Sequence, residues 1–197
     1  MPLEVSHRGD DGITVPYPPI FDGIRNNHGF VDTRGRADLA SQIAEGIESN
    51  ALRDCLVKIS QENAYFSLGC DLGHHAESDS PVAQRYVAGG YLQLAAINYA
   101  GATTNQFDEF GLALANALEP LSKRKFWVLD LVGTYVNFRL PGEPPTQAPS
   151  MSVWFYAKAR DQRRAFSARE GMISSISTVL HDRSVVSTLD NSGSRQF

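Results

Sequence analysis

The segment 70–77 holds the densest group of side chains in this chain that could take part in chemistry. It reads Cys-Asp-Leu-Gly-His-His-Ala-Glu. A neutral imidazole can bind a metal ion or accept a proton, and a nearby carboxylate can orient it. On a strand, successive side chains point to opposite faces, so Asp71, His75 and Glu77 share one face and His74 points to the other. We therefore treat His75 as a candidate general base, with Asp71 and Glu77 as the carboxylates that could orient it.

The alternative interpretation of this segment is a solvated polar strand end. It precedes a Ser-Asp-Ser-Pro stretch at 78–81 that is typical of a turn. The loop 101–104, which leads into a predicted helix, lacks the glycine spacing of a phosphate-binding loop. We predict no metal ion and no cofactor.

The two cysteines of the chain are a second pair with possible chemistry. Apolar residues alternate with other residues over 54–59 and again over 66–72, which predicts a hairpin. Matching the apolar faces places Cys55 opposite Cys70, where they could form a redox couple. Both cysteines fall on the apolar parity of their strands, which favours the interpretation that they are small buried residues.

A further candidate site is the sheet face that the helices leave open. If helices cover the face of Phe66, Leu68, Leu92, Leu94 and Phe155, alternation places large aromatic side chains on the opposite face. The predicted ligand-binding residues of this open face are Arg85, Tyr91, Tyr135, Trp154 and Tyr156, with Trp127 and Leu131 as neighbours. An apolar area of this size usually marks a protein interface or a ligand site.

These residues are positioned by a pattern that alternates between helical and strand periodicity. Apolar side chains recur at helical spacing over 38–50, 103–120 and 162–181. Period-two or continuously apolar runs predict strands at 54–59, 66–72, 83–98, 126–140 and 151–159. The order α-β-β-β-α-β-β-α predicts an α+β fold, a two-layer sandwich with a largely antiparallel five-stranded sheet and about three helices on one face.

The ends of the chain differ in composition from the centre. Residues 1–37 are rich in proline and glycine, which predicts an extended N-terminal arm rather than a helix or central strand. The apolar stretch 15–21 within it should pack on the body of the protein or on a second subunit. Residues 38–189 should form a single α+β domain, and residues 190–197 a flexible tail.

Composition limits the classes of function. With 197 residues and 42% hydrophobic content, the chain can bury one sizeable core. Eighteen basic against 22 acidic side chains give a net charge of −4, which argues against nucleic acid as the main partner. An interpretation as a nucleic-acid binder would depend on four arginines: Arg160, Arg163, Arg164 and Arg169. The absence of a long apolar run and the low number of cysteines lead us to expect a soluble, cytoplasmic protein with no membrane partner.

Two functional hypotheses remain at this point. The first is a small binding or interaction protein that uses the aromatic open face of its sheet as a homo-oligomer. The second is an enzyme that acts on a small apolar or aromatic metabolite in a pocket on that face, with His75 and a carboxylate as an acid-base pair. Geometry has to decide between them, because a general base needs its orienting group within hydrogen-bond reach.

Overall fold

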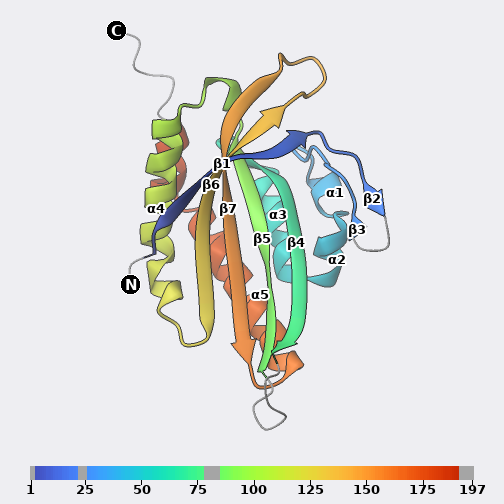
Figure 1. Ribbon diagram of the computed structural model, residues 1–197, viewed down its shortest axis with the longest axis vertical. Helices are drawn as coiled ribbons and strands as arrows, with labels where there is room; N and C mark the ends of the chain where they lie inside the picture. The colour runs from blue at the N-terminus through green and yellow to red at the C-terminus, as the bar shows by residue number, and fades with distance from the viewer. Residues whose placement is uncertain (1–2, 22–25, 78–84, 191–197) are drawn as a thin grey trace.

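Five strands form one sheet in the order β1-β6-β7-β5-β4. Figure 1 shows these strands side by side. The computed structural model describes residues 3–21, 26–77 and 85–190. Strands β4 to β7 pair antiparallel with their neighbours, whereas β1 pairs parallel with β6. The strands are β1 (Val5–Val15), β4 (Tyr65–Glu77), β5 (Arg85–Ala96), β6 (Trp127–Phe138) and β7 (Thr146–Ala159). The predicted α+β sandwich with a largely antiparallel five-stranded sheet is therefore confirmed, and the pairing of β1 with β6 makes the sheet mixed.

Helices cover one face of this sheet, and smaller elements lie beside the edge strand β4 (Figure 1). The helices that pack on this face are α3 (Asn50–Ile59), α4 (Thr104–Ser122), α5 (Gln162–Leu180) and α6 (Arg183–Asp190). The elements beside β4 are α1 (Ala37–Ala40), α2 (Ala44–Glu48) and the short β2–β3 pair (Ile20–Phe21 and Asn26–Asn27). A 3₁₀ turn, η1 (Tyr99–Gly101), precedes α4. Among the helices that the structure describes, none is long and apolar enough to cross a membrane.

The predicted helices 103–120 and 162–181 are confirmed as α4 and α5. Thr103 caps α4 by accepting a hydrogen bond from the Gln106 backbone N–H, and the Gln106 side chain accepts one from the Thr103 backbone in return. Asp161 caps α5 by accepting from the Arg164 backbone N–H. Both helices bury an apolar stripe against the sheet.

The predicted strand 54–59 is wrong, because this segment belongs to helix α3. Its buried residues are Leu52, Cys55, Leu56 and Ile59, a spacing of three, one and three that marks a single helix face. Ser49 caps the helix by accepting from the Leu52 backbone N–H. The predicted helix 38–50 is correspondingly broken into α1 and α2. The fifth strand comes from the arm instead, so the element order begins with β1.

A bulge in β4 inverts the predicted face of its first half. Phe66 pairs with Ala95 and Cys70 pairs with Leu92, with a register shift between Ser67 and Gly69. Cys70 therefore lies on the helix-covered face, whereas Phe66 lies on the opposite face. Period-two alternation fails here because a bulge adds one residue to one strand of the pair.

The sheet consequently has an apolar core on each side. The helix-side core contains Leu92, Leu94, Val153 and Phe155 together with the apolar stripes of α3 to α6. The arm-side core is smaller, and its buried members are Val15, Phe66, Leu68, Ala95, Tyr99, Val136, Phe138, Leu140 and Ala148. Tyr17 and Phe30 of the arm pack against it. The arm thus covers part of the face opposite the main helices.

Candidate functional site

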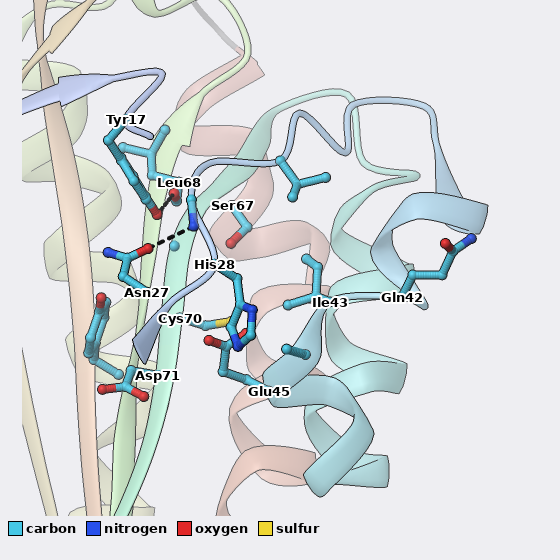
Figure 2. Close-up of a pocket in the computed structure, with 15 residues that line it drawn as sticks. Tyr17, Asn27, His28, Gln42, Ile43, Glu45, Ser67, Leu68, Cys70 and Asp71 are labelled. Carbon is cyan, nitrogen blue, oxygen red and sulfur yellow. Dashed lines mark hydrogen bonds between the residues drawn. The ribbon is translucent and has the colours of Figure 1, made fainter. Parts of the chain in front are cut away.

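A cavity of about 470 Å³ lies between the arm, helix α2 and the edge strand β4. Figure 2 shows His28 of the arm and Glu45 of α2 facing each other beside β4. We call it the arm cavity. Its lining residues are Tyr17, Asn27, His28, Gly29, Val31, Gln42, Ile43, Ala44, Glu45, Ser67, Leu68, Gly69, Cys70, Asp71 and Tyr91. A volume of this size is in the range that holds a small molecule.

Tyr17 fixes the arm over the bulge of β4. Its hydroxyl donates a hydrogen bond to the Leu68 carbonyl at 3.0 Å, drawn as a dashed line in Figure 2. The Tyr17 carbonyl accepts from the Phe30 backbone N–H at 3.0 Å, which ties the two sides of the arm together. A Cβ on Gly69 would lie 2.8 Å from the Tyr17 hydroxyl oxygen, so this close contact depends on glycine at position 69.

Tyr91 connects the arm cavity to the open face of the sheet. It lines the cavity, and its ring centroid lies 4.7 Å from that of Trp154 on the neighbouring strand. Tyr156 follows on the same face of β7, because it is two residues further along the strand. Trp154 and Tyr156 are partly exposed, while Val153 and Phe155 are buried in the helix-side core. The predicted faces of Tyr91, Trp154 and Tyr156 are therefore correct.

The arm cavity has a negative electrostatic character. Burial raises the pKa of Glu45, and the neighbouring carboxylate of Asp71 adds to the shift while His28 opposes it. In Figure 2 the His28 ring lies beside the Glu45 carboxylate. Burial, followed by the charges of Asp71, Cys70 and Glu45, raises the pKa of Tyr91 to about 12. Glu45 and Tyr91 therefore favour their protonated forms, because ionising either of them adds negative charge to a partly dehydrated site.

Substituting Glu45 with glutamine should stabilise the protein at neutral pH. The folded state raises the pKa of Glu45 above its unfolded value, so its ionisation opposes folding. That loss of stability is absent when the pH is below the pKa that Glu45 has in the unfolded chain. It is complete once the pH exceeds the pKa of Glu45 in the folded protein. We expect Glu45→Gln to have a higher midpoint of thermal unfolding than wild type at pH 7. The difference should shrink as the pH is lowered towards 4.

The matched control is Glu109→Gln, at an exposed position on α4 that lines neither described cavity. Its unfolding midpoint should follow wild type across the same pH range. A Glu45→Gln protein that is less stable than wild type at pH 7 would contradict the assignment of an electrostatic penalty to this carboxylate.

The structure does not bring the predicted pair Asp71 and His75 together. Asp71 lines the arm cavity, whereas His75 is exposed and lines neither described cavity. The two are four residues apart on β4, about 13 Å along the strand, so Asp71 cannot orient the His75 ring. The backbones of Glu77 and Arg85 pair at the end of the β4–β5 hairpin. The side chains of Glu77 and Arg85 lie outside the described part of the chain.

The predicted face of Tyr135 is wrong. Tyr135 pairs with Pro149 on the same parity as Leu131 and Trp127, which pack in the helix-side core. Its hydroxyl lies 2.7 Å from the Thr104 hydroxyl at the start of α4. The error arose because both parities of β6 are apolar, so periodicity alone could not assign its faces. Tyr135 instead lines a second cavity of about 320 Å³, beside β1 and α4.

The predicted cross-strand pairing of the cysteines is also wrong, because Cys55 lies on α3. Both cysteines are free, and both contribute to the helix-side core. Burial raises the pKa of Cys55 to about 11, and it raises that of Cys70 as well. A thiol with a raised pKa is a poor nucleophile at neutral pH, although Cys70 lines the arm cavity. The described residues include no group of three or more His, Cys, Asp or Glu placed to hold a metal ion.

Sequence reasoning missed Tyr17, His28 and Glu45, which line the cavity from the arm and α2. The apolar stretch around Tyr17 did indicate that the arm packs on something, but nothing in the sequence identified β4 as its partner. Arg169, a candidate for phosphate contacts, is 5% exposed and lies over the Phe166 ring, so it is not available to a nucleic acid.

The chain matches no protein-family model, no curated protein and no solved structure, so function has to be argued from the site.

Proposed function

We propose that this protein is a small binding protein that takes an organic ligand in the arm cavity, at the edge of the open face of its sheet. The observation that carries this proposal is the position of Tyr91. Its ring forms part of the cavity wall and contacts Trp154, so the cavity and the aromatic open face are one continuous surface. Aromatic walls with a few converging polar groups are typical of small-molecule sites.

The polar groups of the cavity supply the contacts that could orient a ligand. Asn27, Gln42 and Ser67 offer neutral donors and acceptors, and Glu45 and Asp71 offer carboxylates. The edge strand β4 contributes further hydrogen-bonding groups, because an edge strand has backbone N–H and C=O groups that face away from its single partner strand. Tyr17 already uses one of these groups, the Leu68 carbonyl.

The proposal of an enzyme with His75 as general base has less support. His75 is exposed and about 13 Å along β4 from Asp71. His28 is the imidazole that lines the cavity, and it neighbours Glu45. The raised pKa of Cys70 disfavours its use as a nucleophile in that group.

We extend the proposal to self-association and to a cytoplasmic location. Below the arm, the open face presents Trp154 and Tyr156 partly exposed, with Val128 46% exposed beside them. A second copy of the chain could cover this apolar area. Two free thiols, one buried and one partly buried, are consistent with a reducing compartment.

Native mass spectrometry of the protein mixed with small monocyclic aromatic compounds tests both parts. We expect complexes of one compound per subunit, and subunits that associate as dimers or larger oligomers. Ala44→Phe should remove the ligand complexes, because Ala44 is a half-buried residue of the cavity wall and a phenyl group there would fill the space. The control Ala76→Phe, at an exposed position of β4 outside the cavity, should retain them.

Two outcomes would count against the proposal. Equal ligand binding by Ala44→Phe and wild type would place the site elsewhere. A purely monomeric wild-type protein at micromolar concentration would contradict the proposed self-association while leaving the ligand site in place.

A further inference from the structure

The charges that line the arm cavity are unbalanced. Glu45 enters from α2 and Asp71 from β4, so two carboxylates approach the space from different elements (Figure 2). None of the described lining residues is Lys or Arg. His28 can carry a positive charge, but it can balance only one of the two carboxylates. With both carboxylates ionised, the cavity therefore has a net negative charge whether or not His28 is protonated.

The walls of the cavity suit an organic cation. The tyrosine rings of Tyr17 and Tyr91 line it, and the negative face of an aromatic ring attracts a cation that lies over it. Ile43, Val31 and Leu68 add apolar surface that could cover the carbon skeleton of a ligand. A bare metal ion fits these walls poorly, since the described residues provide no group of three metal ligands.

We infer that the arm cavity selects ligands with a positively charged amine, held between the carboxylates of Glu45 and Asp71 and against the rings of Tyr17 and Tyr91. This inference rests on the proposed function, because it names the class of ligand for the same cavity. A cavity of about 470 Å³ has room for a one-ring amine together with some water.

The titration of the cavity groups agrees with this ligand class. Burial raises the pKa values of Glu45, Tyr17, Cys70 and Tyr91, and in each case a neighbouring acidic group of the cavity adds to the shift. A bound ammonium group would supply the positive charge that the site lacks. It would favour the ionised form of Glu45 and so offset the penalty that this carboxylate imposes on the empty protein.

The test compares three probes of similar size that differ in charge: 2-phenylethylamine, 2-phenylethanol and phenylacetate. Binding is measured by titration in ¹H-¹⁵N correlation spectra, which report both affinity and location. We expect the amine to shift the amides of Glu45, Gly69 and Asp71 and to bind about tenfold more tightly than the alcohol, a difference of about 1.4 kcal/mol. Phenylacetate should bind most weakly.

Variants separate charge from shape. Glu45→Gln and Asp71→Asn should each reduce the affinity of the amine several-fold and leave that of the alcohol nearly unchanged. Tyr91→Leu should also weaken the amine more than the alcohol, because it removes the ring but keeps an apolar wall. Glu109→Gln and Asp130→Asn, at exposed positions outside the cavity, are the matched controls and should behave as wild type.

The possible failures are distinguishable. If the alcohol or phenylacetate shifts the cavity amides with an affinity equal to that of the amine, the inference of charge selection is wrong and the ligand cavity remains. If none of the three probes shifts the cavity amides, both the charge selection and the proposed ligand site are rejected. If the amine binds equally well to the Glu45→Gln, Asp71→Asn double variant, its affinity does not come from these carboxylates.

Discussion

Alanine at position 90 should lower the free energy of unfolding by about 3 kcal/mol or more. Gly90 lies on β5, where an added Cβ would be 2.0 Å from the backbone carbonyl oxygen of Asp71 on β4. No rotamer change relieves a clash between a Cβ and backbone, so the two strands would have to separate. Urea unfolding followed by circular dichroism measures the effect, which belongs to the severe class of single substitutions.

Gly73→Ala is the matched control for this substitution. Gly73 lies on β4 in the same strand pair, and an added Cβ there has no neighbour within 4 Å. Its substitution should change stability by less than about 0.5 kcal/mol. Equal and small effects at both positions would show that β4 and β5 are not as close at Gly90 as the structure has them. Because Asp71 also lines the arm cavity, Gly90→Ala should weaken ligand binding as well.

The elements that the sequence predicts well carry their signals locally. In α4, the Thr103–Gln106 capping box marks where the helix begins, and the stripe of Phe107, Phe110 and Leu114 marks its buried face. Both signals are local and indicate the same helix. The glycine pair at 89–90 lies where neighbouring strands approach closely, since an added Cβ would meet the carbonyl of Phe155 at position 89 and that of Asp71 at position 90.

The errors arose where two periodicities fit the same residues. The segment around Cys55 alternates at Cys55, Val57 and Ile59, but Leu52, Cys55, Leu56 and Ile59 also form a helical stripe. Only the packing of that stripe against α5 and the sheet selects the helix. The face of Phe66 was assigned wrongly for a different reason, since the bulge before Gly69 has no signal in alternation.

The arm shows the limit of sequence reasoning for the candidate site. Strand β1 pairs with β6, more than 120 residues later in the chain, through positions such as Val5 with Leu131. Nothing in the polar stretch 6–12 predicts that pairing. Tyr91 could be placed on the open face from its own strand, but Tyr17 and Glu45 reach the same cavity only through the course of the arm and α2.

The arm-side core is what holds the arm, and with it one wall of the cavity, onto the sheet. Phe66 is fully buried at its centre, with the rings of Tyr99 and Phe138 each 6.3 Å away between centroids. The Arg34 guanidinium also lies over the Phe66 ring, 4.9 Å from the ring centroid. Arg34 in turn forms ion pairs with Asp32 at 2.7 Å and Glu143 at 3.3 Å. Phe66 thus connects the Arg34 end of the arm to the arm-side core.

Phe66→Ala should therefore lower the free energy of unfolding by about 3–5 kcal/mol, the usual range for removing a buried ring. The lost ring leaves a space beneath the arm. We therefore also expect the amides of Phe30 and Arg139, which donate to the arm carbonyls of Tyr17 and Val15, to lose protection from hydrogen exchange, and ligand binding in the cavity to fall. Phe21→Ala is the control, because the Phe21 side chain is 63% exposed and its removal should change stability by less than about 0.5 kcal/mol. A Phe66→Ala protein that keeps its stability, or that binds cavity ligands as wild type does, would show that the arm is held in place by other contacts.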